Sequence, residues 1–296
     1  MARADSASPE KGLLARAPSG ALVLGAIASV QFGAAVATTL FQRLGPGGTV
    51  FLRLATAAIV LLVLWRPRLH LRSARELQLA ALFGLVLAGM NLTFYEALHR
   101  IPLGIAVAVE FVGPLGVAVA GSRRRLDALW IALAAGGILA LTRGGAHTLD
   151  GLGLLLALIA GCFWGCYILL NARLGSSFEG STGLALAMCV AAVAALPAGV
   201  ADGGAHLLEP ESLALGAAVG MLSSAIPYSF EIEALRRIAT PVFGVLMSIE
   251  PAMGALAGFL VLGQGLSARA VLGIAMVVTA SVGASRHARA APIAVQ

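Results

Sequence analysis

The sequence consists largely of long apolar runs separated by short polar segments. A helix that crosses the hydrocarbon core of a bilayer needs roughly 20 mostly apolar residues, and most runs are about that long. Short connections make consecutive helices antiparallel neighbours. The pattern predicts an all-α integral membrane protein of ten transmembrane helices, with cytoplasmic tails at residues 1–19 and 287–296. The apolar runs cover residues 20–41, 47–65, 76–98, 103–121, 126–142, 151–171, 181–200, 213–235, 241–262 and 268–285.

The composition strengthens the membrane prediction. Hydrophobic residues make up 59% of the chain, charged residues 11%, and the mean hydropathy is +0.93. Average soluble domains carry roughly 25% charged residues, so this chain has to leave much of its apolar surface in lipid. The formal net charge of +6 does not indicate a nucleic-acid partner. The basic residues lie in the short segments between apolar runs, where they set membrane topology.

The basic residues are distributed unequally between the two sides of the membrane. With ten crossings, alternate connections share a side with both termini, and that side holds 15 of the 20 Lys and Arg residues. One more, Arg53, lies inside a run. Cytoplasmic connections carry the excess of Lys and Arg, so we expect both termini in the cytoplasm. The remaining basic residues, on the outer side, are Arg43, Arg100, Arg143 and Arg269.

The two halves of the chain share a short pattern. In each half a Glu-Ala-Leu-X-Arg-Ile stretch is followed by a proline, a glycine and then a glutamate six residues after the glycine. Each half has five crossings, an odd number, so equivalent helices run in opposite directions. The sequence thus predicts two inverted five-helix repeats, residues 20–143 and 151–286, as in many secondary transporters, whose substrate site lies near the midplane between the repeats. The paired positions are Glu96 and Glu233, Pro102 and Pro241, Gly104 and Gly244, and Glu110 and Glu250.

Two carboxylates lie near the middle of apolar runs, Glu110 and Glu250. A charge there costs roughly 2.5–3.5 kcal/mol on insertion scales. Pro114 removes the amide that would bond to the carbonyl of Glu110, and Pro251 frees the carbonyl of Met247. Free backbone polar groups in a membrane are tolerated only where they face protein or a wet cavity. Either the two carboxylates bind a substrate ammonium or a proton in a central cavity, or they belong to structural kinks and are satisfied by neighbouring groups.

Arg53 lies about six residues into the second run, roughly 9 Å along a helix. Three interpretations are open. The guanidinium pairs with Glu110 or Glu250, it receives a substrate carboxylate through its planar fork, or it extends outward to the membrane surface.

Other polar groups in the runs divide into two sets. Glu96 and Glu233 lie near the membrane surface, and each precedes an arginine by four residues, the favourable spacing for a helical ion pair. We expect these two pairs to be structural. A deeper set is expected to line the cavity, and it consists of Asn91, Tyr95, Tyr228 and Glu231.

Several kinds of chemistry have no motif in this sequence. The chain lacks the glycine-rich phosphate loop of ATP-using proteins, and it lacks the H-E-x-x-H and G-x-S-x-G motifs of hydrolases. All five histidines fall in loops, at helix ends or in the tail. We therefore expect no catalytic residue, no metal and no cofactor.

Two stretches of the sequence carry a family resemblance. They comprise residues 89–95 with 102–115 in the first half, and residues 227–231 with 243–252 in the second. These stretches resemble the drug/metabolite transporter superfamily, in particular the EamA-type proteins of the bacterial threonine/homoserine exporter group. The resemblance extends from the first run to the last. It implies a ten-helix inverted-repeat fold and the export of small amino acids, driven by proton entry.

The leading hypothesis is a secondary transporter in a bacterial inner membrane. It would export threonine-like or homoserine-like amino acids, or related metabolites, by proton antiport. Glu110 and Glu250 would bind the substrate ammonium or carry the proton. A transporter of a drug or another metabolite within the same superfamily is the first alternative. An intramembrane enzyme acting on lipid is the second, although no cluster of reactive groups lies at one membrane face.

Overall fold

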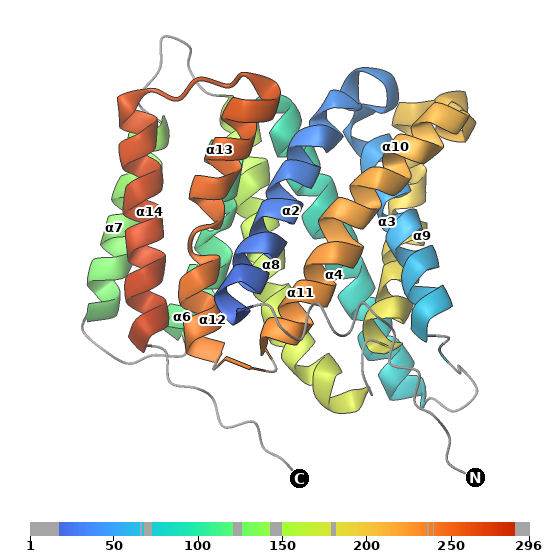
Figure 1. Ribbon diagram of the computed structural model, residues 1–296, viewed down its shortest axis with the longest axis horizontal. Coiled ribbons are helices and arrows are strands. Elements are labelled where there is room, and N and C mark those ends of the chain that lie inside the picture. The colour runs from blue at the N-terminus through green and yellow to red at the C-terminus, as the bar shows by residue number, and fades with distance from the viewer. Residues whose placement is uncertain are drawn as a thin grey trace.

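The computed structural model describes residues 18–65, 67, 73–120, 126–142, 150–178, 182–235, 237–238 and 240–287. Within these ranges every regular element is a helix, which confirms the predicted all-α class for the described part of the chain. Figure 1 shows a bundle in which α2 (Ser19–Thr39) begins and α14 (Ala268–His287) ends at the same, lower side.

Within the described residues, eight helical stretches are long and apolar enough to cross a membrane. Two of the eight are broken helices, each made of two shorter α-helices. The stretches are α2, α3 (Phe41–Trp65), α4 (Ala74–Arg100), α5 (Leu103–Glu110) with α6 (Val112–Ala120), α8 (Gly151–Ser177), α9 (Thr182–Gly203) with the short 3-10 helix η2 (Gly204–Leu208), α12 (Thr240–Met247) with α13 (Glu250–Leu262), and α14.

Two of the ten predicted crossings are not among these eight stretches. The fifth run forms α7 (Leu126–Thr142), which is apolar but shorter than the others. The eighth run is divided into α10 (Pro210–Gly220), a π-helical segment η3 (Met221–Ala225) and α11 (Ile226–Leu235), which follow one another directly. A division of this kind was not predicted from the sequence.

The two broken helices are interrupted at the predicted prolines. α5 ends at Glu110, whose carbonyl would need an N–H donor from residue 114, and Pro114 has none. In the second half α12 ends at Met247, and α13 restarts at Glu250 with Pro251 in its first turn, a position where proline is well tolerated. Each break therefore places a glutamate at a helix end.

The helices pack in pairs that link the two halves of the chain. α3 lies against α9, α7 against α14, and α5 against α13. α4 and α6 also lie against α8, and α11, α12 and α13 lie against α2. In Figure 1 the α7–α14 pair forms one end of the bundle, and α3 lies toward the other end. The broken helices lie between these ends.

Glycines on several helices allow close contacts between neighbouring helices. A Cβ atom added at Gly161 would lie 2.5 Å from the carbonyl oxygen of Glu110, and one at Gly254 would lie 3.0 Å from Val107. At Gly220 an added Cβ would lie 2.8 Å from Thr56 of α3. Small residues let membrane helices approach closely and pack well, and here they bring α8 and α13 against α5, and α10 against α3.

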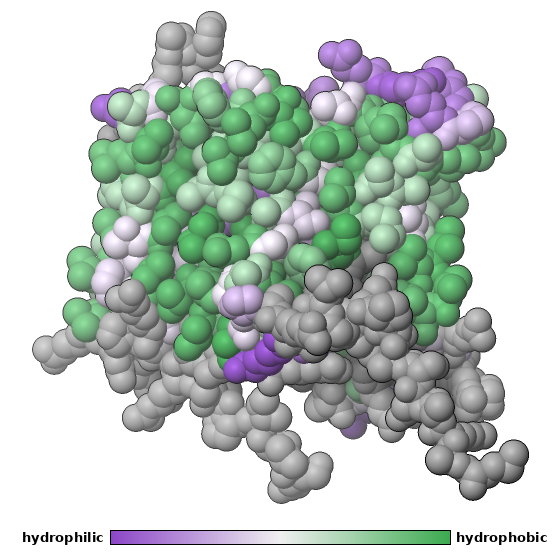
Figure 2. Space-filling model, in the orientation of Figure 1, coloured by the Kyte–Doolittle hydropathy of each residue, from purple (hydrophilic) through white to green (hydrophobic). Residues whose placement is uncertain are grey.

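The face drawn in Figure 2 is apolar over most of its height. Many large apolar side chains are exposed there or elsewhere on the bundle, for example Phe259 at 59% and Leu272 at 57%. Polar residues gather at the upper right corner of the figure, over η2 and the start of α10. In that corner Arg43 forms ion pairs with Glu209 and Glu211. An apolar band with polar ends is the surface expected of a protein that spans a bilayer.

Candidate functional site

Glu110 is buried at the break between α5 and α6, and only 7% of the residue is exposed. Gly161 of α8 packs against its backbone, and Trp164 of α8 contacts the ring of Phe111 edge-on, with ring centroids 5.3 Å apart. Within the described part of the chain the carboxyl group has no hydrogen-bond or ion-pair partner. The cation in its electrostatic range is Arg53.

Glu250 lies at the corresponding break, and only 4% of it is exposed. The turn that precedes it is fixed by Ser248, whose hydroxyl donates to the carbonyl of Gly244 at 3.0 Å and shares a hydrogen bond of 2.7 Å with Ser281 of α14. The Glu250 carboxyl has no hydrogen-bond or ion-pair partner among the described residues either. Both sequence-predicted carboxylates are therefore buried, at helix breaks, and available for a ligand or a proton.

Three carboxylates of the bundle lie within electrostatic range of Glu250 or belong to it. Glu250 interacts electrostatically with Glu110 and with Glu231, which is half-buried on α11. Gln31 of α2 faces the same helix as Glu250, since its Oε1 atom lies 3.1 Å from the position of an added Cβ at Gly254, one turn beyond Glu250. That oxygen is buried and has no partner in the described residues. The side chain of Tyr228, another predicted site residue, lies outside the described residues.

Arg53 extends into the bundle rather than outward to the membrane surface. Its Nη1 donates to Asn91 Oδ1 at 2.6 Å and to the Tyr95 hydroxyl at 3.1 Å, and its Nη2 donates to the carbonyl of Ser223 at 3.1 Å. The guanidinium carbon also lies 5.4 Å from the centroid of the Tyr95 ring, within the range of a cation–π interaction. The structure thus brings the predicted residues Arg53, Asn91 and Tyr95 together. It shows no ion pair of Arg53 with a described carboxylate.

Asn91 and Tyr95 are themselves held rigidly. Asn91 is 4% exposed, and its Nδ2 donates to the carbonyl of Leu87 at 2.8 Å while its Oδ1 accepts from Arg53. Tyr95 is fully buried, and its ring lies 5.9 Å from that of Phe41. These contacts fix the guanidinium in one orientation, because its two partners on α4 have little freedom of their own.

The π-helical segment η3 contributes polar groups that the sequence interpretation missed. Ile226 donates its N–H to Met221, and Pro227 has no N–H to give. The carbonyls of Leu222 and Ser223 are therefore left for side chains. Leu222 accepts from the hydroxyl of Ser29 at 2.6 Å, and Ser223 accepts from Arg53. Pro227 was the available signal, by the same reasoning that identified Pro114. Short π-helical segments frequently occur at functional sites.

The two predicted structural ion pairs are confirmed. Arg100 Nη2 lies 2.7 Å from Glu96 Oε1, and Arg237 pairs with Glu233. Arg100 also contacts Asp150 at 3.3 Å, at the N-cap of α8. The backbone N–H of Leu152, which donates to Asp150 at 2.8 Å, holds the pKa of that carboxyl below its ordinary value, and Arg100 acts in the same direction.

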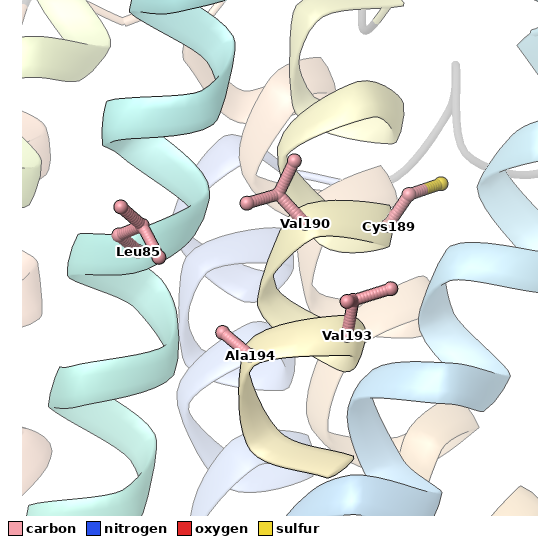
Figure 3. A pocket seen from close by; sticks show the side chains of 5 residues that line it. All are labelled: Leu85, Cys189, Val190, Val193 and Ala194. Carbon is pink, nitrogen blue, oxygen red and sulfur yellow. The ribbon is translucent and has the colours of Figure 1, made fainter. Parts of the chain in front are cut away.

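Neither of two hollows described on the molecule is lined by Glu110 or Glu250. One, of about 380 Å³, is lined by Leu85 of α4 and by side chains of α9 (Figure 3). Its other side chains, Cys189, Val190, Val193 and Ala194, offer lipid-like surface and no strong polar group. The second, of about 300 Å³, is more polar and includes the carboxylates of Glu96 and Asp202. The predicted central cavity corresponds to neither hollow.

The architecture and the polar groups define a class of protein. Apolar helices form a bundle, two of them are broken inside the apolar band, and each break carries a buried carboxylate. Discontinuous helices with polar groups near the membrane midplane are typical of secondary transporters. The described helices therefore belong to a multi-pass membrane transporter.

Comparison with known proteins supports this class and identifies the family. Residues 151–286 match the EamA-like transporter family. The chain is 41% identical to the threonine/homoserine exporter RhtA of Salmonella typhimurium strain LT2, over 92% of either chain. It is also 41% identical to RhtA of Escherichia coli K12, over 90% of this chain and 91% of that one. The protein belongs to the EamA-like transporter family, in the group of these two exporters, and is a transporter rather than an enzyme.

A solved structure supports the fold alone. A protein of known crystal structure superimposes with a TM-score of 0.60 over 91% of this chain and 98% of its own, at 19% sequence identity.

Proposed function

We propose that this protein exports threonine, homoserine or similarly small amino acids across a bacterial inner membrane. The 41% identity to two proteins named as threonine/homoserine exporters, over at least 90% of the chain, supports the choice of cargo. The single observation that carries the mechanism is the placement of Glu110 and Glu250. Both are buried at helix breaks, without a hydrogen-bond or ion-pair partner among the described residues, and they interact electrostatically with each other.

The proposed topology has ten crossings in two inverted repeats, residues 20–143 and 151–286. Under this repeat α2 exchanges with α8, α3 with α9, and the broken helix α5–α6 with α12–α13. The observed packing supports this exchange. The repeat maps the contact of α4 with α8 onto the contact of α10 and α11 with α2, and both contacts are present. It maps the contact between α3 and α9 onto the same pair of helices. Ten crossings put both termini on one side, and the excess of Lys and Arg makes that side the cytoplasm.

Transport would proceed by alternating access around the carboxylates. In inverted-repeat transporters one bundle rocks against the other about a fixed central site. The breaks in α5–α6 and α12–α13 are the natural places for such motion, since the helices there lack continuous backbone hydrogen bonds. Glu110, Glu250 and Glu231 would bind the substrate ammonium or a proton, and Asn91, Tyr95, Tyr228 and Arg53 would line the site. A proton entering from outside would exchange for an amino acid leaving the cell.

An efflux measurement tests the proposal. Cells that lack their own threonine exporters are loaded with radiolabelled threonine, and efflux is compared for wild type, Glu110→Gln, Glu250→Gln and the matched control Glu96→Gln. Wild type should export threonine, and the Glu110 and Glu250 variants should lose about tenfold or more of the rate, since each loses a charged contact. Glu96→Gln, a change at an exposed ion pair, should retain most of it.

The same assay separates the proposal from its alternatives. Wild-type efflux of threonine and homoserine no higher than that of empty-vector cells would remove these amino acids as cargo. Equal efflux from wild type and Glu110→Gln would remove Glu110 from the mechanism while leaving the cargo in place.

A further inference from the structure

The guanidinium of Arg53 is a fixed cation inside the bundle. It is held from α4 by Asn91 and Tyr95 and from η3 by the carbonyl of Ser223. All of these partners are neutral. An arginine that merely needed burial would be balanced by a carboxylate, because an uncompensated buried charge is strongly destabilising. Arg53 has no such ion pair among the described residues, and Glu110 is the carboxylate within its electrostatic range.

The hydrogen bonds leave the Nε donor and one further donor of the guanidinium unused. An arginine side chain has five N–H donors, and the three bonds to Asn91, Tyr95 and Ser223 use both donors of Nη1 and one of Nη2. The Nε atom is buried and has no partner among the described residues. Nε and Nη2 together form the fork that binds a carboxylate through two parallel hydrogen bonds.

Further unpartnered polar atoms lie on the segment that holds Arg53. The hydroxyls of Ser223 and Ser224 are buried, with 3% and 1% of each residue exposed, and neither has a partner in the described part of the chain. Buried polar groups are normally hydrogen-bonded, so an unsatisfied one requires an explanation such as an absent ligand. The π-helical segment thus carries two orphan hydroxyls, that of Ser223 facing Gly33 of α2, and it also binds Arg53, whose Nε is a third orphan atom.

We propose that Arg53 binds the α-carboxylate of the cargo through the edge formed by Nε and Nη2, while Glu110 receives its ammonium group. The site would then select zwitterionic α-amino acids, in which the ammonium and the carboxylate groups are bonded to the same carbon atom. Asn91 and Tyr95 are positioning residues, since they orient the fork. This inference deepens the proposed function and rests on it. The competing interpretation is that Arg53 only neutralises Glu110 in another conformation of the protein.

Binding of charge-deleted analogues to the purified protein tests the assignment. The probes are L-threonine, L-threoninamide, which lacks the carboxylate, and 3-hydroxybutyrate, which lacks the ammonium. Wild type should bind threonine about ten- to a hundredfold more tightly than threoninamide, the effect expected for charged hydrogen bonds. Arg53→Gln should reduce threonine affinity to that of threoninamide and leave threoninamide unchanged. Glu110→Gln should lower the affinity for threonine and threoninamide but leave the affinity for 3-hydroxybutyrate unchanged.

Two further variants keep the test decisive. Arg53→Lys retains the charge but not the fork, so it should give an intermediate ratio of affinities even if Arg53→Gln fails to fold. Arg100→Gln, an arginine in an exposed ion pair, should leave the ratio at its wild-type value.

The outcomes separate the inference from the proposed function. Equal affinities of wild type for threonine and threoninamide would overturn the inference alone. A wild-type protein that binds none of the threonine-like probes would overturn the proposed function as well. If Arg53→Lys and Arg53→Gln lower the affinities for threonine and threoninamide equally, Arg53 serves as the partner of Glu110, and the carboxylate assignment is wrong.

Discussion

Tight packing of α8 against the break in α5–α6 leaves no room for a side chain at Gly161. A Cβ atom there would lie 2.5 Å from the carbonyl oxygen of Glu110, 3.2 Å from its carbonyl carbon and 3.3 Å from its Cα. Favourable contacts between heavy atoms begin at about 3.5 Å. All three atoms belong to the backbone, so Gly161→Ala has to move α8 and α5 apart by roughly 1 Å.

The magnitude of this effect can be isolated with a control one turn away. Overpacking of a well-packed interior costs about 1–3 kcal/mol. Alanine also favours a helix over glycine by about 1 kcal/mol, which offsets part of the loss. At Gly165, also on α8, an added Cβ would lie 3.5 Å from the side chain of Val117, so Gly165→Ala gains the helix preference without the overlap. The difference between the two variants should be about 1–3 kcal/mol.

Thermal unfolding in detergent and threonine efflux provide the assay. Gly165→Ala should melt at or above the wild-type temperature, and Gly161→Ala should melt below Gly165→Ala. Efflux should fall in Gly161→Ala, because the shifted helix carries the backbone of Glu110 with it. Equal melting temperatures and equal efflux for the two variants would refute the claim that this contact positions Glu110.

Two further predictions concern stability. Ser248→Ala should cost about 1–3 kcal/mol by leaving the buried Ser281 hydroxyl unpaired, and Ser281→Ala should cost less, because Ser248 keeps its hydrogen bond to the carbonyl of Gly244. The double variant should cost less than the sum of the two; an additive result in this double-mutant cycle would show that the 2.7 Å hydrogen bond between them contributes nothing. The N–H of Leu152 holds the pKa of Asp150 below its ordinary value. The charged carboxylate therefore stabilises the fold at every pH above the pKa that Asp150 has in the unfolded chain. That stabilisation is lost as the pH falls through the lower pKa that Asp150 has in the folded protein. The melting temperature of wild type should therefore exceed that of Asp150→Asn at neutral pH, and the difference should disappear below about pH 4. A difference in melting temperature that does not change with pH would contradict this prediction.

The helical class and the helix breaks could be predicted from the sequence because both depend on local chemistry. Long apolar runs require helices in a membrane. Pro114 and Pro251 remove specific backbone donors, and the breaks at Glu110 and Glu250 lie where that reasoning predicts. The ion pairs of Glu96 and Glu233 also follow from local spacing on one helix, and both form.

The environment of Arg53 was not predictable in the same way. Its partners Asn91 and Ser223 are 38 and 170 residues away in the chain, so the sequence left pairing, substrate binding and outward extension equally open. The π-helical segment was missed although Pro227 removes the donor for the carbonyl of Ser223. Only the packing of η3 against α2 and α3 determines that the freed carbonyls meet Ser29 and Arg53.

Transport by the isolated protein tests the central claim most directly. Purified protein is reconstituted into liposomes with an acidic interior, and uptake of radiolabelled threonine is followed from a neutral medium, so that protons leave as threonine enters. The proposed antiport predicts concentrative uptake that requires the pH gradient, competes with homoserine and is lost in Glu110→Gln. Threonine uptake no faster than in protein-free liposomes would contradict it.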